Sequence, residues 1–485
     1  MLCWAEKLKK KQTKMKVNNA SFRDESGFIF EKNGVLYRQI NPVYAADYEL
    51  LFSLGLYEKL VSKKYLIPHE EVSDFAVEGA YKIIRPTPIP FISYPSSWSF
   101  SMLKEAALLT LKIQKLAVAH GMILKDASIY NIQFVGYQAI FIDTLSFEKL
   151  EEGEAWVAYG QFCRHFLAPI LLMSYTDIGL NKLLQLYIDG VPLDVAAKIL
   201  PWKSKWNLGN YLHLFLHAKT HKKHENTTAQ KSEKKPIISK KSLLNIAESL
   251  KTTISKTTLH RTPSEWNDYY EKDVSKTYFI DKERVVKGFF GKTKAKTVLD
   301  LGANDGTFSR FCAEKSDYVL SFDIDAFCVE DNFQALKKDK IKNILPLVFD
   351  AANPEPAFGW ANEERTSIWE RTNVDTILAL AIVHHLAISN NLPFEKIAKK
   401  LSEHCQYLII EFVPKTDEKV QRLLMGRKDI FHDYTQEKFE FEFFKYFNLV
   451  EKTNVGQAER VMYLLNVKLF RYPTGFENLS GMEKV

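Results

Sequence analysis

The 485 residues of this chain are too many for one hydrophobic core, and roughly 150 residues per domain predicts two or three units, of which we expect two. Apolar residues make up 46% of the sequence, which excludes a wholly disordered protein. The five cysteines are scattered without a C-x-x-C pair, which argues against zinc and redox sites and favours a reducing cytoplasm. No apolar run approaches the roughly 20 residues that span a bilayer, so we expect a cytoplasmic protein without a transmembrane segment.

The net charge of +7 is concentrated in two lysine-rich segments. Residues 1–16 hold six lysines and one glutamate, and residues 219–241 hold eight lysines and two glutamates. The rest of the chain is therefore slightly acidic, which argues against a large basic groove for nucleic acid on the folded domains. We interpret the lysine-rich segments as solvated tails and linkers, and a weak nucleic-acid or membrane role for them stays open.

The second lysine-rich segment also predicts where the chain divides, because it is almost free of apolar residues. Leu244, Ile246 and Leu250 follow it with helical spacing and predict a connector helix. We find no internal repeat at a fixed period. The predicted parts are a first domain at 21–218, a basic linker and connector at 219–262, and a second domain at 263–485.

In the first domain, chemistry-bearing residues follow a long predicted helix. The Ala- and Leu-rich stretch Met102–Ala119 predicts this helix, and Asp126, Asn131 and Asp143 come after it. The β-rich runs at 132–135 and 139–142 separate the last two of these residues and predict a hairpin. Upstream, 35–40 is a predicted strand that carries Arg38, and 91–94 is a predicted hinge strand.

This spacing resembles the protein-kinase and aminoglycoside-phosphotransferase superfold, which implies an α+β domain. The resemblance implies that Asp126 orients an accepting hydroxyl, and that Asn131 and Asp143 hold the magnesium of Mg-ATP. Four departures put activity in doubt. No glycine-rich loop lies near 26–34, and Arg38 stands where a lysine is usual, with Lys82 as an alternative. Leu124 replaces the histidine that is usual two residues before the acid, and Thr144-Leu145 replaces Phe-Gly after Asp143. An active phosphotransferase and a degenerate domain are both left open.

The second domain begins with a predicted strand, glycine turn and helix. Thr297–Leu301 is a β-rich apolar run, Gly302 to Gly306 form the turn, and 307–315 has helical spacing. Glycines let the backbone approach a ligand, and the helix start offers unpaired N–H groups. A dinucleotide-binding loop of the pattern G-x-G-x-x-G would require glycine at Asn304 and Thr307, so this alternative fails.

Further predicted strands follow in the order of a doubly wound sheet, and the first three acids stand at strand ends. Asp300 is near the end of the first strand, Asp323 follows the second and Asp350 follows the third. A later strand leads into His384 and His385. The predicted strands after the first are 318–322, 343–349, 374–381, 407–410, 447–451 and 460–467, the last two forming an antiparallel pair.

This arrangement resembles the class I S-adenosylmethionine (SAM)-dependent methyltransferases. More specifically, it is similar to a bacterial methyltransferase family in which some members are called nodulation proteins. The resemblance implies an α/β, Rossmann-like sheet that is mostly parallel with a closing antiparallel hairpin. It also implies that Asp323 binds the ribose of SAM, that Asp350 lies beside the adenine, and that Asn304 replaces the usual middle glycine. The expected cofactor-binding residues are Asp300, Gly302, Ala303, Asn304, Gly306, Asp323, Ile324, Asp350, Ala351 and Leu380.

The methyl acceptor is not encoded in these motifs. If the acceptor is a hydroxyl, a general base is expected, and His384 or His385 is the candidate. Glu411, at the end of the fifth strand, is a possible base or a wall of the pocket. Our leading hypothesis is a methyltransferase for a small molecule or saccharide, with the kinase-like domain in substrate recognition or regulation. The alternatives are a bifunctional methyltransferase and small-molecule phosphotransferase, and a non-catalytic scaffold.

Overall fold

The computed structural model describes residues 15–219, 237–261, 276–425, 428–456 and 459–468. The chain divides into two units, and the division does not follow the sequence in one cut. Unit 1 combines Met1–Asn267 with Asp323–Arg371, and unit 2 combines Asp268–Phe322 with Thr372–Val485. A segment from the middle of the predicted second domain therefore belongs to the same unit as the first domain.

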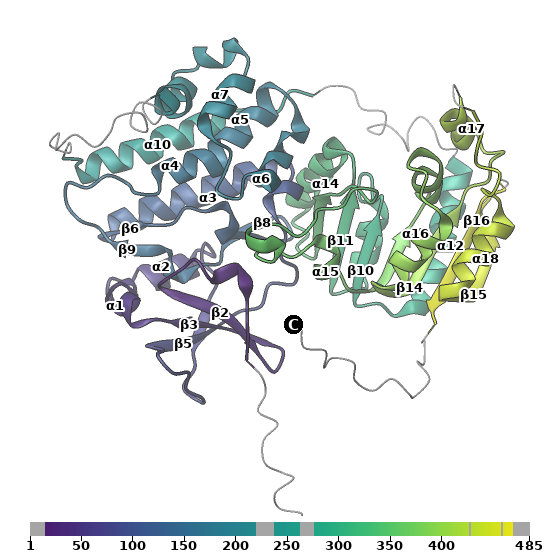
Figure 1. Ribbon diagram of the computed structural model, residues 1–485, viewed down its shortest axis with the longest axis horizontal. Helices are drawn as coiled ribbons and strands as arrows, with labels where there is room; N and C mark the ends of the chain where they lie inside the picture. Colours follow the sequence, from purple (N-terminus) through teal and green to yellow (C-terminus); the bar gives the residue numbers. More distant parts are fainter. Residues whose placement is uncertain (1–14, 220–236, 262–275, 426–427, 457–458, 469–485) are drawn as a thin grey trace, which may run out of the picture. The chain divides into compact units, whose positions relative to one another are not determined.

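Unit 1 begins with a five-stranded sheet in the order β1-β2-β3-β5-β4, in which all neighbours are antiparallel. Helices α1 and α2 lie between β3 and β4 in sequence, and Ile40, Tyr44, Tyr48, Ile84 and Leu145 form a core cluster beside this sheet. Figure 1 shows the sheet strands β2, β3 and β5 below the long helix α3 (Phe100–Ala119). The bounds are β1 (Lys16–Val17), β2 (Gly27–Lys32), β3 (Val35–Ile40), α1 (Ala45–Ser53), α2 (Leu56–Ser62), β4 (His69–Glu71) and β5 (Lys82–Pro86).

The helical part of unit 1 is built around α3 (Phe100–Ala119), which Ser99 caps by accepting a hydrogen bond from the Met102 N–H. The connector helix α10 (Lys240–Lys256) packs along α3, and Lys115 pairs with Glu248 at 2.6 Å. The remaining elements are β6 (Met122–Leu124), β7 (Ile132–Val135), β8 (Gln138–Phe141), β9 (Phe147–Lys149), α4 (Tyr159–Phe162), α5 (Ala168–Tyr175), α6 (Leu183–Leu186), α7 (Leu193–Ile199) and α8 (Leu208–Asn210). The predicted long helix, the hairpin of β7 and β8 and the connector helix are thus confirmed.

The predicted strand at 91–94 is wrong, because these residues form no ladder. Pro90 and Pro95 flank the segment, and proline has no N–H to donate. The backbone of Ser93 instead pairs with the Gln133 side chain, which accepts from the Ser93 N–H at 2.9 Å and donates to the Ser93 carbonyl at 3.1 Å. An amide side chain therefore takes the place of a neighbouring strand.

The segment Asp323–Arg371 is tied to the rest of unit 1 by buried polar contacts. Glu330 on α14 (Ala326–Asp339) accepts a hydrogen bond from the Ser101 N–H at 2.9 Å. Glu355 accepts from the Ser96 and Ser97 hydroxyls and pairs with Arg371. The segment also holds β12 (Ile344–Val348) and the short α15 (Ile368–Arg371). Strand β12 therefore lies in a segment that residues before the linker hold in place.

The seven-stranded sheet has the order β12-β11-β10-β13-β14-β16-β15. Strand β10 is parallel to β11 and β13, β13 is parallel to β14, and β16 is antiparallel to both β14 and β15. This is the mixed α/β sheet with a closing antiparallel hairpin that the sequence predicted. The strands not yet given are β10 (Thr297–Leu301), β11 (Tyr318–Asp323), β13 (Val374–Ala379), β14 (Cys405–Phe412), β15 (Phe447–Asn454) and β16 (Val461–Val467).

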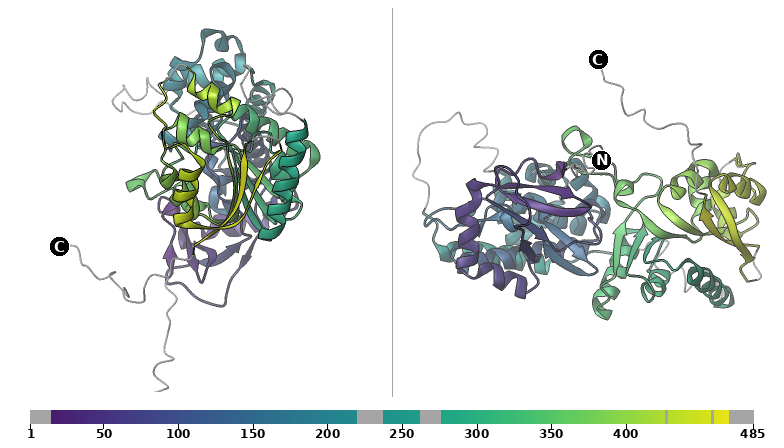
Figure 2. Two further views of the ribbon diagram at one scale, coloured as in Figure 1. Left: turned by 90° about the vertical axis from the view of Figure 1, so that its right-hand side faces the viewer. Right: turned by 90° about the horizontal axis from the view of Figure 1, so that it is seen from below.

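Helices cover both faces of the sheet in unit 2, as Figure 2 shows. Helix α16 buries Phe394, Ile397, Ala398 and Leu401, which share one helical stripe. Strands β10 and β14 are almost wholly buried, as expected for strands with helices on both faces. The helices of unit 2 are α12 (Lys276–Thr293), α13 (Thr307–Ala313), α16 (Phe394–Ser402), α17 (Glu418–Leu424) and α18 (Gln436–Tyr446).

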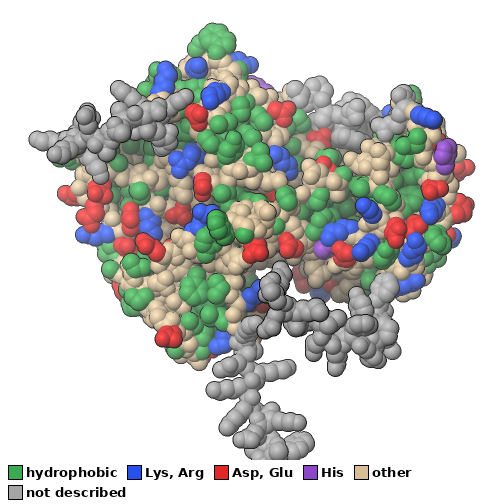
Figure 3. Space-filling view, viewed as in Figure 1, with side chains coloured by type: hydrophobic (Ala, Val, Ile, Leu, Met, Phe, Trp, Pro, Cys, Tyr) green, Lys and Arg blue, Asp and Glu red, His purple; other side chains and the backbone are tan. Residues whose placement is uncertain are grey.

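Most of both lysine-rich segments, 1–14 and 220–236, lies outside the described residues. Among the residues that the structure describes, none of the helices combines the length and apolar character that crossing a membrane requires. On the face in Figure 3, acidic and basic side chains are interspersed. The lack of a nucleic-acid surface and the cytoplasmic location stay predictions.

Candidate functional site

The glycine turn between β10 and α13 has the conformation that its glycines predict. Gly302 and Gly306 have φ angles of +79°, and Asn304 reaches φ +51° without being glycine. The N–H groups of Gly302 and Ala303 both donate to the Phe322 carbonyl, at 2.8 and 2.9 Å. The turn is therefore fixed to the end of β11 by two backbone hydrogen bonds.

A side chain would not fit well at Gly302. A Cβ atom there would lie 3.2 Å from Cδ1 of Ile382, and the positive φ adds strain for any L-residue. Leu380, which follows β13, is buried. The turn thus packs against the segment that follows β13, and its contact with a ligand stays a prediction.

Asp300 is buried at the end of β10 and is held by the first helix after the turn. The Ser309 hydroxyl on α13 donates to Asp300 Oδ2 at 2.6 Å, and a 2.8 Å hydrogen bond joins the Ser309 and Ser321 hydroxyls. A carboxylate in this position fixes α13 against the sheet. A direct contact between Asp300 and the cofactor stays a prediction.

In unit 1, the two later acids stand at strand ends as predicted. Asp323 Oδ1 accepts from the Asp325 N–H at 2.8 Å, and Asp350 Oδ1 accepts from the Ala352 N–H at 2.8 Å. The Asp323 carbonyl also accepts from the Phe349 N–H at 2.7 Å. Each carboxylate therefore shapes its own loop through one oxygen. Ile324 is exposed and Ala351 is half-buried.

Asp350 also lines a cavity of about 330 Å³ within unit 1, together with residues that precede the linker. Lys182 ends the short helix η7 (Ile178–Lys182) and is the lysine of this cavity. Burial lowers the pKa of Lys182, while the charges of Glu355 and Asp350 raise it. The lining residues are Gly179, Leu180, Lys182, Leu183, Gln185, Leu186, Asp350 and Asn353.

In unit 2, a buried ionic network surrounds Glu411, near the end of β14. Lys282 on α12 pairs with Glu411 at 2.7 Å, and the Tyr278 hydroxyl donates to the same carboxylate. Arg460 lies 3.6 Å from Glu411 and forms two hydrogen bonds to Asp417, at 2.7 and 3.1 Å. Burial alone would raise the pKa of Glu411, but the charges of Lys282 and Arg460 lower it overall. Glu411 is therefore an anion with cationic partners and is unsuited to act as a free base.

The two predicted base candidates lie next to each other after β13. The His384 and His385 rings are 4.2 Å apart, and His384 is almost completely buried. Burial lowers the pKa of both histidines, and His385, Arg460 and Lys282 lower that of His384 further. Nδ1 of His384 has no hydrogen-bond partner among the described residues. Both imidazoles are therefore neutral near pH 7, and Nδ1 of His384 is a buried polar atom that can form a hydrogen bond with a ligand.

The structure brings the kinase-like residues together but pairs them with one another. The Asn131 amide donates to Asp126 at 3.1 Å, and Arg38 lies 2.7 Å from Asp143. The Ser146 hydroxyl and the Leu145 N–H also donate to Asp143, at 2.7 and 2.9 Å. A guanidinium thus neutralises the carboxylate that would bind a metal, and these residues do not fit Mg-ATP. Lys82, the alternative to Arg38, pairs with Glu49 on α1 at 2.8 Å and with Glu71 at 2.9 Å.

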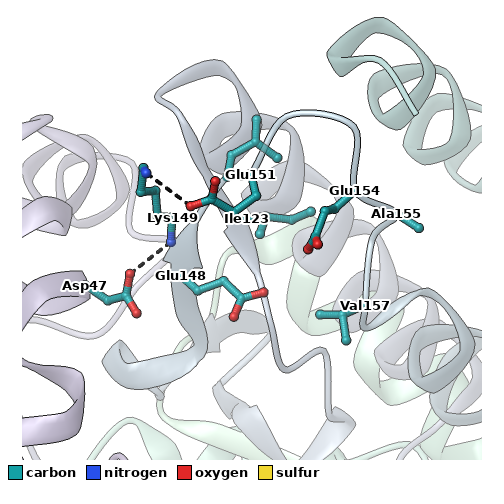
Figure 4. A pocket seen from close by; sticks show the side chains of 9 residues that line it. Asp47, Ile123, Glu148, Lys149, Glu151, Glu154, Ala155 and Val157 are labelled. Atoms are coloured by element: carbon teal, nitrogen blue, oxygen red, sulfur yellow. Dashed lines mark hydrogen bonds and ion pairs between the residues drawn. The ribbon is translucent and has the colours of Figure 1, made fainter. Parts of the chain in front are cut away.

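A second cavity in unit 1, of about 380 Å³, has four acidic residues among the nine that line it (Figure 4). Asp47 accepts from the Lys149 N–H at 2.9 Å, and Lys149 pairs with Glu151 at 3.1 Å. Burial raises the pKa of Glu148, and the nearby Lys125 lowers it. Within the described ranges, no group of three or more His, Cys, Asp or Glu side chains is placed to hold a metal ion.

Comparison with known proteins decides the family. No family model matches the sequence. The nodulation protein NoeA of Rhizobium meliloti (strain 1021) is 31% identical over 458 residues, which cover 91% of this chain and 94% of NoeA. The chain belongs to the NoeA family. Because the match covers most of both proteins, the family likeness includes the residues before the linker as well as those after it.

Solved structures similar to the NoeA-family chain include SAM-dependent methyltransferases. The N-methyltransferase NodS from Bradyrhizobium japonicum WM9 is 13% identical, with a TM-score of 0.28 over 38% of this chain and 96% of NodS. A SAM-dependent methyltransferase from Aquifex aeolicus is 18% identical, with a TM-score of 0.29 over 40% of this chain and 94% of that protein. NodS has also been solved with S-adenosyl-L-homocysteine.

Sequence reasoning did not find four residues of the NoeA-family chain that the structure brings to these places. They are Lys182 in the cavity with Asp350, and Tyr278, Lys282 and Arg460 around Glu411. One signal was present: Tyr278 and Lys282 are spaced i, i+4 on a helix whose buried face continues with Val285, Val286 and Phe289. A lysine on such a face must pair with a buried acid.

Proposed function

We propose that this NoeA-family chain is a SAM-dependent methyltransferase acting on a small-molecule or saccharide acceptor. The glycine turn carries the proposal. Gly302 and Gly306 have positive φ angles, a side chain at Gly302 would approach Ile382, and the two N–H groups of the turn anchor it to β11. A dinucleotide fold would need further glycines that this turn lacks. The methyltransferase-like sheet order and the strand-end acids support the same reading.

Each residue of the proposed cofactor site has a role that its chemistry fits. Gly302 and its neighbours let the backbone approach the methionine part without a Cβ. In this proposal the Asp323 carboxylate binds the ribose hydroxyls, and Asp350 accepts from the adenine amino group. When bound, SAM supplies a methyl group activated by its sulfonium, so the protein mainly orients the acceptor and excludes water.

The acceptor end of the proposed site contains His384, His385 and the ionic network around Glu411. A neutral imidazole accepts a proton from a hydroxyl, and His385 is the better general base because it is less buried. His384, with its unpartnered Nδ1, positions the acceptor through a hydrogen bond. Lys282 and Arg460 hold Glu411 in place and leave it no role as a base.

The part before the linker acts in this proposal by completing and regulating the methyltransferase. Adenine presents an amino donor next to a ring-nitrogen acceptor. Asp350 and Lys182 line one cavity and offer the matching acceptor and donor. A phosphotransferase activity is not part of the proposal, because Arg38 pairs with the carboxylate that would bind magnesium.

The decisive experiment is calorimetric titration of the full chain with SAM and with S-adenosylhomocysteine. The full chain is required because Asp323–Arg371 belongs to the same unit as residues before the linker. We expect binding of both compounds and, with metabolite extracts, transfer of a labelled methyl group detected by mass spectrometry. A folded chain that gives no heat with either compound would sink the proposal.

One further titration and one turnover measurement separate the alternatives. Mg-ATP should give no heat, and clear binding would restore the bifunctional reading. Turnover of SAM with any extract fraction would exclude the scaffold reading, whereas cofactor binding without turnover in every fraction would favour it.

A further inference from the structure

An exposed aromatic and aliphatic surface lies shortly before the lysine-rich linker and has no role in the proposed reaction. Trp202 and Trp206 are 66% and 72% exposed, and their rings stack edge to face at 4.5 Å. Leu208 is 70% exposed, and Leu212 and Leu216 are also exposed. Isolated exposed leucines are ordinary, but two tryptophans and three leucines within one short stretch are not.

The local structure explains why these side chains face outward together. Trp202 and Trp206 belong to the short helix η8 (Trp202–Trp206), and the next helical stretch runs through α8 and η9 (Tyr211–Leu216). Leu208, Leu212 and Leu216 follow one another at four-residue spacing on this stretch, so they form one stripe. The opposite side is buried, and His213 there hydrogen-bonds to the Ser249 hydroxyl at 2.8 Å. We call Trp202, Trp206 and the leucine stripe the Trp–Leu surface.

Only basic charges accompany the Trp–Leu surface in the sequence. No acidic residue occurs between Asp194 and Glu225, whereas this stretch has six lysines. Lys203 and Lys205 alternate with the tryptophans and are exposed, and Lys205 lies 5.1 Å from the Phe215 ring centre. The basic segment 219–241 follows directly in sequence.

We propose that the Trp–Leu surface docks the protein on an anionic lipid bilayer. Tryptophan favours the boundary between head groups and acyl chains, because its ring is apolar and its N–H is polar. Exposed leucines enter the same boundary, and lysines beside them are attracted to anionic head groups. An apolar surface on a partner protein would not explain why the stretch between Asp194 and Glu225 has lysines and no acidic residue, whereas an anionic bilayer would. An anionic bilayer is the partner that fits both the exposed tryptophans and the positive charge of the neighbouring lysines.

The test uses the full chain and sedimentation with vesicles. The vesicles contain phosphatidylcholine alone or phosphatidylcholine mixed with phosphatidylglycerol. We expect the protein to pellet with the anionic vesicles, and to be released by high salt. Trp202→Ala/Trp206→Ala should abolish most of the binding, and Lys203→Gln/Lys205→Gln should weaken it by about fivefold for each lysine.

Matched controls keep the result specific to this surface. Trp360 is 72% exposed and lies in another segment, so Trp360→Ala should bind vesicles as the natural chain does. Lys59→Gln/Lys63→Gln on and beside α2 removes two exposed lysines elsewhere. Thermal melting should not change in any of these variants, because each replaced side chain is exposed.

Three outcomes would overturn the proposal. The first is a natural chain that does not pellet with anionic vesicles at low salt. The second is a tryptophan or lysine double variant of this surface that pellets as well as its control. The third is self-association of the natural chain in velocity sedimentation that the tryptophan variant abolishes, since the surface would then bind a second copy. None of these outcomes depends on whether the chain transfers methyl groups.

Discussion

The guanidinium of Arg38, on β3, lies 2.7 Å from Oδ1 of Asp143, the residue that the sequence predicted as a magnesium ligand. The same guanidinium pairs with Asp24 at 2.6 Å. Both Arg38 and Asp143 are 9% exposed, so the pair is largely removed from water. Arg38 is therefore a structural cation that neutralises Asp143. In a phosphotransferase this carboxylate would have to be free to bind a metal ion.

Removing this arginine should destabilise unit 1. Arg38→Met leaves the buried Asp143 carboxylate without its cation, which costs roughly 3 to 5 kcal/mol in the free energy of unfolding. Urea denaturation followed by fluorescence measures the loss. The double variant Arg38→Met/Asp143→Asn should recover part of it, because residue 143 is then neutral while its amide oxygen still accepts from the Leu145 N–H.

The control for Arg38 is Arg85, which pairs with Glu70 on the surface of the same sheet. Both partners are exposed, so Arg85→Met should change the free energy of unfolding by less than about 1 kcal/mol. Equal effects of the two arginine variants would show that the Arg38–Asp143 pair has no special structural role.

The glycine turn permits a second prediction, on cofactor affinity. Gly302→Ala should lower the free energy of unfolding by roughly 1 to 2 kcal/mol, because φ at this residue is positive, and should weaken SAM binding by about tenfold, because the added Cβ lies where the proposal places the cofactor. Gly291→Ala is the matched control, since Gly291 lies in α12 with open space around it. This control should gain about 0.5 to 1 kcal/mol of stability and bind SAM unchanged. Calorimetry and urea denaturation give the two readouts.

Lys182 permits a third prediction, which separates the affinity for SAM from the stability of the protein. Burial lowers the pKa of Lys182, which means that removing its charged ammonium group from water costs free energy on folding. Lys182→Met should weaken SAM binding by about threefold to tenfold and leave the protein equally or slightly more stable. Lys198→Met, which removes an exposed lysine, should change neither quantity. If Lys182→Met lowers stability and leaves affinity unchanged, Lys182 is a structural residue only.

The sequence predicted what short segments determine by themselves. A β-rich apolar run followed by Gly302 predicts a strand and a turn, and the structure places β10 at the residues expected. The closing hairpin followed from two runs with β propensity, and β15 and β16 pair antiparallel as predicted. The positions of Asp323 and Asp350 at strand ends could be predicted because the apolar runs that form the strands stop at these residues.

Pairs of residues far apart in the sequence were not predictable. No local pattern predicts that Arg38 neutralises Asp143, because the sequence around each residue is consistent with its predicted strand or turn whether or not the two residues meet. The cavity shared by Lys182 and Asp350 depends on packing within unit 1, which crosses the predicted domain boundary. The wrong strand at 91–94 has the same cause, since the Gln133 side chain that replaces a neighbouring strand comes much later in the chain.

The last prediction concerns pH, and it rests on a buried histidine of unit 1. Burial lowers the pKa of His165 to about 3, whereas an unfolded histidine titrates near pH 6.5. Above about pH 6.5 both states are neutral at this residue and stability does not depend on its titration. Below that pH only the unfolded chain takes up the proton, so stability falls by about 1.4 kcal/mol for each pH unit until the folded pKa is reached. In His165→Gln this contribution is absent. The free-energy difference between the natural chain and His165→Gln should therefore shift by about 2 kcal/mol, at the expense of the natural chain, between pH 7.5 and pH 5. Urea denaturation at the two pH values measures it, and carboxylates common to both proteins cancel. A shift in the opposite direction, or none, would mean that the folded protein protonates His165 as readily as the unfolded chain does.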